Sequence, residues 1–118
     1  MLVDTSVWVQ HFRAGNQHLE DLLQEGQVVT HSFIIGELAC GNLKNRLEIL
    51  SLLQSLPTTL TLAFEEFLFF LEQNQLMGTG LGFVDVHLLA SAKLADTPLW
   101  TLDKKLNAAS HTLGIRYR

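Results

Sequence analysis

Short apolar runs alternate along the chain with longer segments in which apolar residues recur every three or four positions. The short runs predict five strands, at residues 2–3, 28–29, 59–62, 99–102 and 114–117. The longer segments predict amphipathic helices at residues 5–12, 17–24, 32–41, 47–56, 64–76, 84–95 and 103–110. Strands that alternate with helices predict an α/β fold with a short, mainly parallel five-stranded sheet, whose ligands bind beyond the carboxyl ends of the strands.

Length and composition indicate a single domain that spans residues 1–118. A chain that is 47% hydrophobic and 17% charged can bury one core of this size without disulfides or a structural metal. Cys40 has no second cysteine to pair with, which favours a reducing compartment. The N-terminus has no basic segment ahead of an apolar run, and the longest charge-free stretch, residues 49–64, is too short and too polar to span a bilayer. We therefore expect a cytoplasmic protein with no membrane segment.

The charge balance narrows the ways in which the protein could act on nucleic acid. Eight Lys and Arg residues face twelve Asp and Glu residues, a formal net charge of −4. This balance argues against a protein that wraps nucleic acid through its overall charge. It leaves open a nuclease in which bound metal ions supply the positive charge.

Four acidic residues stand at positions where an acid is costly or where an α/β fold builds its sites. Asp4 and Asp103 each follow a predicted strand, so in a parallel sheet their carboxylates emerge at the same edge. Glu37 lies in the apolar helix IIGELACG, where we expect it to be partly buried. Asp85 opens the helix after a glycine-rich connector, on the face that helical spacing turns toward the core.

Two explanations of these acids compete. Taken singly, Asp4, Asp85 and Asp103 are explained as helix N-caps, which accept backbone N–H groups and meet the positive end of the helix dipole. A shared site explains all four acids at once, but four neighbouring carboxylates repel each other unless divalent cations supply the countercharge. Oxygen ligands without a His or Cys cluster suit Mg²⁺ or Mn²⁺, and a metal-bound water can hydrolyse a phosphodiester.

The same residues resemble the PIN-domain ribonucleases, and within them the VapC-type toxins of bacterial toxin–antitoxin pairs. The resemblance covers nearly the whole chain, in the order VDTSVW with Asp4, IIGELACG with Glu37, GFVDVHLLASA with Asp85 and LWTLDKKL with Asp103. It implies a PIN-like three-layer α/β/α fold. It also implies a metal-dependent endoribonuclease toxin, in which the four acids bind one or two Mg²⁺ or Mn²⁺ ions and cleave RNA.

The resemblance further implies partners and additional site residues. The hydroxyls of Thr5, Ser6 and Thr101 match positions that line the metal site in the family. A cognate VapB-type antitoxin is expected to cover the site and to bind DNA as part of the complex, and the toxin commonly forms a homodimer. Arg13, at the end of the first predicted helix, is a candidate contact for RNA phosphates.

Two other functions fit parts of the sequence. The first is a non-catalytic interaction domain, in which the acids only cap helices and the phenylalanine-rich segment at residues 64–71 binds a partner. Apolar side chains surround that helix on several sides, which predicts either a buried core helix or an interface. The second is an aspartate-dependent phosphatase with Asp4 as covalent nucleophile, although Ser6 stands where such enzymes carry a second aspartate.

Four further features have simple expected roles. Ser32 is expected to cap the helix that follows it. Cys40 is expected to be a small core residue. The five scattered histidines, His87 among them, are expected to be structural or surface residues, because no pair has the close helical spacing of a zinc site. The closing segment Arg116–Tyr117–Arg118 is either a phosphate contact or a frayed end of the chain.

Overall fold

The computed structural model describes the whole chain, residues 1 to 118, as seven helices and two regular strands. In chain order the elements are β1 (Leu2–Val3), α1 (Thr5–Ala14), α2 (Gln17–Gln24), α3 (Ser32–Ala39), α4 (Arg46–Ser55), α5 (Phe64–Gln73), α6 (Phe83–Leu94), β2 (Leu99–Trp100) and α7 (Lys104–Thr112). None of these helices has the length and apolar character that crossing a membrane requires.

A small parallel sheet forms the centre of the molecule. β1 lies beside β2, with Leu2 opposite Leu99. On its other side β1 is bridged in parallel to Val29, whose N–H donates to the carbonyl of Met1 at 2.8 Å. Leu2 and Leu99 are fully buried, so the apolar runs at residues 2–3 and 99–100 are strands because both of their faces are covered.

Two outer segments extend this centre to the predicted five parallel segments. Arg116 is bridged to Leu99, and Thr58 is bridged to Thr30. All of these pairings are parallel, so the carboxyl ends of the segments meet at one edge of the sheet. The α/β fold with a parallel sheet is thus confirmed, but only β1 and β2 are regular strands, because each of the other segments pairs at isolated bridges.

The third predicted strand, at residues 59–62, is wrong in position. The pairing residue is Thr58, and Thr59 makes the last backbone hydrogen bond of this segment, donating to the carbonyl of Thr30 at 2.8 Å. Beyond it the chain leaves the sheet and crosses α6, where Ser91 Oγ donates to the carbonyl of Leu60 at 2.7 Å. The alternation of apolar and β-branched residues there reflects a loop with Leu62 buried and Leu60 exposed.

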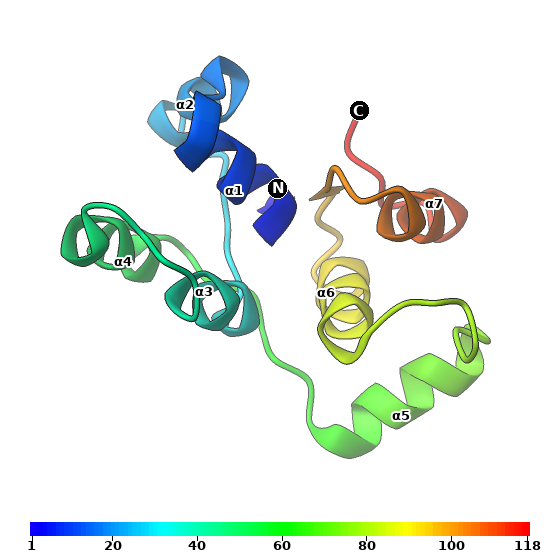
Figure 1. The fold of residues 1–118 in the computed structure, drawn as a ribbon. Coiled ribbons are helices and arrows are strands. Elements are labelled where there is room, and N and C mark those ends of the chain that lie inside the picture. The colour runs from blue at the N-terminus through cyan, green and yellow to red at the C-terminus, as the bar shows by residue number, and fades with distance from the viewer.

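Helices cover the sheet on both sides. Figure 1 shows α1 to α4 on one side of the molecule and α5 to α7 on the other, with the chain's short strands between them. α6 is the central helix of the second group, because it contacts α5, α7 and β2 and every residue from 86 to 92 is buried. The helices are those predicted, with ends displaced by a few residues.

The start of α3 differs from the expectation. Ser32 is the first helical residue, and the N-cap is His31. The imidazole Nδ1 of His31 accepts the free N–H of Phe33 at 2.9 Å. The His31 ring can serve this role because it is fully buried beneath the first turn of the helix, whereas Ser32 is exposed.

His31 belongs to a buried aromatic cluster that links α3, α5 and α6. The ring of His87 is stacked on Phe67 at a centroid distance of 4.5 Å and meets Phe33 and Phe83 edge-on. His31 lies 6.5 Å from His87, and Nε2 of His31 and Nδ1 of His87 have no hydrogen-bond partner. Burial, together with the neighbouring His87, lowers the pKa of His31 to about 4, and burial lowers the pKa of His87 as well. Both rings are therefore neutral core residues.

Acid is expected to destabilise this fold through His31. Between its ordinary pKa and the folded value of about 4, the unfolded chain binds a proton that the folded protein excludes, so the free energy of unfolding falls as the pH falls. Lowering the pH from about 7 to about 5 should cost about 1 to 2 kcal/mol, measured by urea unfolding. His31→Asn keeps a cap acceptor but does not titrate, so its pH dependence should be shallower. The exposed His111→Asn serves as control, and equal slopes for His31→Asn and the unmodified chain would contradict the assignment.

Candidate active site

Asp4 is held rigidly at the point where β1 ends and α1 begins. It caps α1 and is only 7% exposed. Its Oδ2 atom accepts hydrogen bonds from Ser6 Oγ and Thr101 Oγ1, each at 2.7 Å, and a longer one from the N–H of Ser6 at 3.4 Å. Because all of these donors meet Oδ2, the orientation of the carboxylate is fixed and Oδ1 accepts no hydrogen bond from the protein.

The same two hydroxyls connect Asp4 to Asp103. Thr101 Oγ1 accepts the N–H of Asp103 at 3.0 Å, and Ser6 Oγ accepts the N–H of Leu102 at 3.0 Å. Asp103 then caps α7, accepting the N–H of Leu106 at 2.9 Å, and its side chain is otherwise exposed. Ser6 and Thr101 therefore tie together two acids that lie almost a hundred residues apart in the sequence.

Glu37 reaches the same region from α3. Thr5 Oγ1, in the first turn of α1, donates to Glu37 Oε1 at 2.7 Å. The expectation that Glu37 is partly buried is wrong, because its side chain is exposed. α3 buries the face that carries Ile34 and Leu38, which are four positions apart, and Glu37 stands to one side of that face.

Asp85 is the acid whose charge is most unfavourable. It lies half-buried in the first turn of α6, where its Oδ2 accepts the N–H of Gly82 at 3.3 Å. Burial raises the pKa of Asp85, and the charges of three other acids raise it further against the opposing hydrogen bond. These three acids are Asp4, Asp103 and Glu37. Asp4 and Asp103, the N-caps of α1 and α7, and Glu37 of α3 are therefore near enough to the first turn of α6 to affect the charge of Asp85.

The donor set fits a hard divalent cation. No three His, Cys, Asp or Glu side chains stand close enough together to hold one ion directly. Mg²⁺ is commonly held by one or two carboxylates and keeps several of its waters, so direct ligation by all four acids is not required. The free Oδ1 of Asp4 and the unfavourable charge of Asp85 are what such an ion would satisfy.

A groove leads away from the Glu37 side of these acids. Its volume is about 660 Å³, and it runs between α1 and the segment from α3 to α4. Arg13, the predicted RNA contact, lines this groove together with Lys44. Its apolar lining includes Val9 and Phe12 of α1. Sequence reasoning missed Val9, although its spacing from Phe12 is a helical signal that could have indicated it.

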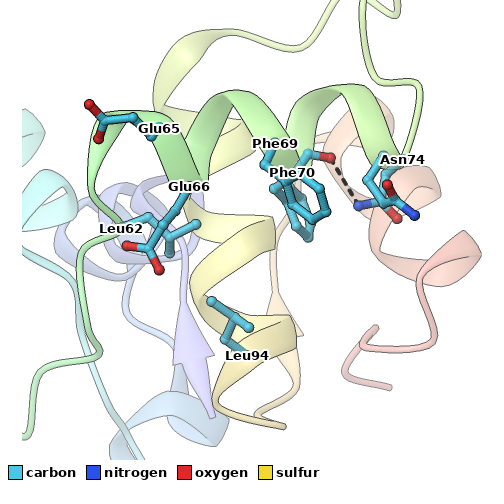
Figure 2. A pocket seen from close by; sticks show the side chains of 8 residues that line it. Leu62, Glu65, Glu66, Phe69, Phe70, Asn74 and Leu94 are labelled. Atoms are coloured by element: carbon cyan, nitrogen blue, oxygen red, sulfur yellow. Dashed lines mark hydrogen bonds between the residues drawn. The ribbon is translucent and has the colours of Figure 1, made fainter.

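A second groove lies on the other side of the molecule, away from the four acids. It has a volume of about 370 Å³ and lies between α5 and α6, where Phe69 and Phe70 of α5 approach Leu94 of α6 (Figure 2). α5 is not a fully buried helix, because Phe67 faces the core while Phe69 is 67% exposed. Of the two possibilities for the phenylalanine-rich segment, the structure supports an exposed apolar face.

Cys40 differs from the expectation as well. The prediction that it lies in the core is wrong, because it is the residue that ends α3 and its side chain is exposed. The apolar face of α3 ends with Leu38, two residues earlier, so Cys40 turns outward.

Replacing Asp85 by Asn should stabilise the metal-free protein. The raised pKa means that the charged form of Asp85 destabilises the folded state. This destabilisation is absent below the ordinary aspartate pKa, where the side chain is protonated in both states, and it grows as the pH rises through the pKa of Asp85 in the folded protein. Asn keeps the acceptor for the N–H of Gly82 and removes the charge. We expect Tm to rise by a few degrees at neutral pH with chelator present, a small gain because water screens a half-exposed group. The gain should vanish near pH 3, and an unchanged gain there would contradict the electrostatic cause.

Replacing Thr101 by Val should loosen the edge of the sheet. Val keeps the shape of the side chain but removes the donor to Asp4 Oδ2 and the acceptor for the N–H of Asp103. The hydrogen bond to Asp4 is buried and the one from Asp103 is partly buried, so the expected loss is about 1 to 3 kcal/mol in the free energy of unfolding. Thr101→Ser, which keeps the hydroxyl, should lose much less in the same urea titration. Equal losses for the two variants would show that the methyl group, not the hydrogen bonds, matters.

Comparison with known proteins agrees with this architecture. The PIN domain family model matches residues 1–111. Ribonuclease VapC32 from Mycobacterium tuberculosis, strains CDC 1551 / Oshkosh and ATCC 25618 / H37Rv, is 40% identical over 116 residues, which are 98% of this chain and 94% of the relative. The crystal structure of PAE2754 from Pyrobaculum aerophilum has the same fold, with a TM-score of 0.63 at 18% identity over 92% of this chain and 82% of that chain. The chain therefore belongs to the PIN-domain family, and within it to the VapC proteins.

Proposed function

We propose that this protein is a metal-dependent endoribonuclease toxin that hydrolyses RNA phosphodiester bonds and is neutralised by a cognate antitoxin. The observation that carries the proposal is the hydrogen-bonded arrangement of the acids. Ser6 and Thr101 link Asp4 to Asp103, and Thr5, the residue after Asp4, donates to Glu37. The raised pKa of Asp85, to which the charges of the other three acids contribute, agrees with this arrangement. The relatives named Ribonuclease VapC32, alike over nearly the whole chain, support the same activity.

Capping alone does not account for this arrangement. Asp4 and Asp103 do cap helices, as the competing explanation requires. Glu37 caps nothing, since it lies near the end of α3 and its Oε1 accepts only the hydroxyl of Thr5. A collection of unrelated caps has no reason to bring a fourth carboxylate to the same edge of the sheet.

Each residue has a defined part in the proposed chemistry. Asp4, Glu37, Asp85 and Asp103 would hold one or two Mg²⁺ or Mn²⁺ ions, which supply an activated water and countercharge for the phosphodiester. Ser6 and Thr101 keep Oδ2 of Asp4 occupied, so that Oδ1 would be free to bind the ion. Thr5 orients Glu37 through the 2.7 Å hydrogen bond. Arg13, in the groove beside Glu37, is placed to contact an RNA phosphate.

The partners proposed for this chain are an RNA substrate, a VapB-type antitoxin and a second copy of the chain. The groove between α1 and α3–α4 is continuous with Thr5 and Glu37, so an antitoxin segment seated there would cover the site. The exposed face of α5, with Phe64 60% and Phe69 67% exposed, offers an apolar surface for a homodimer. DNA would be bound only indirectly, through the antitoxin.

The proposal predicts RNA cleavage that depends on both the metal and Asp85. Antitoxin-free protein is incubated with total cellular RNA and Mg²⁺ or Mn²⁺, and new RNA ends are mapped by sequencing. We expect discrete RNA ends that are absent when EDTA is present. In Asp85→Asn the yield of these ends should fall about 100-fold or more, because losing a metal ligand should cost at least as much activity as losing a residue that hydrogen-bonds to a ligand. Glu72→Gln, an exposed acid on α5, is the isosteric control and should cleave normally.

Each alternative function gives a different result in this assay. Equal cleavage by the unmodified chain and Asp85→Asn, with both folded, would contradict the proposed site. An interaction domain would give no new RNA ends and no change of Tm on adding Mg²⁺ or Mn²⁺, which bind only a native site. A phosphatase would instead be detected by a trapped phosphoaspartate at Asp4.

A further inference from the structure

The C-terminal segment is an ordered part of the sheet and not a frayed end. Arg116 is bridged to Leu99, and the N–H of Tyr117 donates to the carbonyl of Leu99 at 3.0 Å. The hydroxyl of Tyr117 is 2.6 Å from Nε2 of His18, in the first turn of α2. These contacts fix the position of the last residues, so the sequence alternative of a frayed terminus is wrong.

Three aromatic side chains gather around this segment on the surface. His18 is stacked on Tyr117 with ring planes 19° apart, and Trp100 approaches both rings, at 5.3 Å from His18 and 5.6 Å from Tyr117. His18 is exposed, while Trp100 and Tyr117 are half-buried. We refer to His18, Trp100 and Tyr117 as the aromatic ledge.

Basic residues surround the aromatic ledge in an otherwise acidic protein. Arg116 and Arg118 flank Tyr117, and both are exposed. Residues 93–118 contain five of the eight Lys and Arg residues but only two of the twelve acids, a net charge of +3. Residues 1–92 carry the remaining three basic and ten acidic residues, a net charge of −7. The positive charge of the chain is therefore concentrated in the segment that forms the ledge.

The backbone at Trp100 connects the aromatic ledge to Asp4. The carbonyl of Trp100 accepts the N–H of Asp4 at 2.9 Å, and the next residue, Thr101, donates to Oδ2 of Asp4. Asp103 is three residues beyond Trp100, a distance that an extended chain spans in about 10 Å. The ledge lies toward Arg116 at one border of the sheet, and Glu37 lies on the α3 side of β1.

We propose that the aromatic ledge and its two arginines bind single-stranded RNA next to the cleaved phosphodiester. Proteins bind unpaired nucleic acid through aromatic rings, on which the bases stack, and through neighbouring arginines, which bind the phosphates. This inference rests on the proposed ribonuclease function and adds to it where the substrate is held.

Binding can be tested without cleavage, in EDTA. The probe is a fluorescent single-stranded RNA of mixed sequence, about a dozen nucleotides long, titrated by anisotropy. His18→Ala/Tyr117→Ala should weaken binding about 5- to 100-fold, the range expected when base stacking is removed. Tyr117→Phe keeps the ring and should bind nearly normally. His111→Ala, which removes an exposed aromatic ring on α7, is the matched control and should have no effect.

The arginines are tested by the salt dependence of binding. Arg116→Gln/Arg118→Gln should weaken binding and reduce the slope of log Kd against log salt by about 0.7 for each RNA phosphate that an arginine no longer neutralises. Lys93→Gln, whose ammonium is engaged with the carbonyl of Leu113, is the charge control. The arginine side chains are exposed, so this variant tests the inference even where the aromatic double variant unfolds.

The outcomes separate this inference from the proposed function. If both double variants keep the RNA affinity and the salt slope of the unmodified chain while cleavage depends on Asp85, RNA binding by the aromatic ledge is contradicted. The proposed ribonuclease function is then unaffected. Ledge-dependent RNA binding without cleavage by the unmodified chain would overturn the proposed function instead.

Discussion

The hydrogen bonds that meet on Oδ2 of Asp4 are the constraint on which the site depends. Thr101 and Ser6 each donate to this oxygen at 2.7 Å, and the same hydroxyls accept the N–H groups of Leu102 and Asp103. One atom therefore fixes both the end of β1 and the turn into α7. Without these hydrogen bonds, the turn from β1 into α1 and the turn from β2 into α7 would be linked at this edge through the backbone pairing of β1 with β2, which are two residues long each.

The same edge shows how stability and chemistry oppose each other in one place. Asp4 is nearly buried and its charge is well compensated by donors, whereas Asp85 is half-buried with three like charges acting on it. If position 85 had a purely structural role, a neutral side chain would be favoured there. The unfavourable charge of Asp85 is understandable if the folded protein binds a cation, because the positive ion would attract each carboxylate and so offset the repulsion between them.

The sequence was sufficient for the architecture, because the architecture depends on periodicity and on chain order. Asp4 and Asp103 follow the central strands of a parallel sheet, which places them at one edge whatever the details of packing. Burial was harder to predict, since it depends on which face of a helix meets a neighbour. Glu37 and Cys40 lie in an apolar segment but turn outward, and His31 replaces Ser32 as a cap through a ring nitrogen that no local pattern identifies.

The order of the segments in the sheet has a consequence for synthesis. β1 opens the chain, yet its neighbour β2 follows about a hundred residues later, and the last bridge requires Arg116. During translation β1 can pair with Val29 early, but its other edge has no partner until β2 has left the ribosome. Because Asp103 follows β2, the hydrogen bonds that join it to Asp4 through Ser6 and Thr101 form only after this late pairing, so a chain truncated before β2 lacks the link between the two acids.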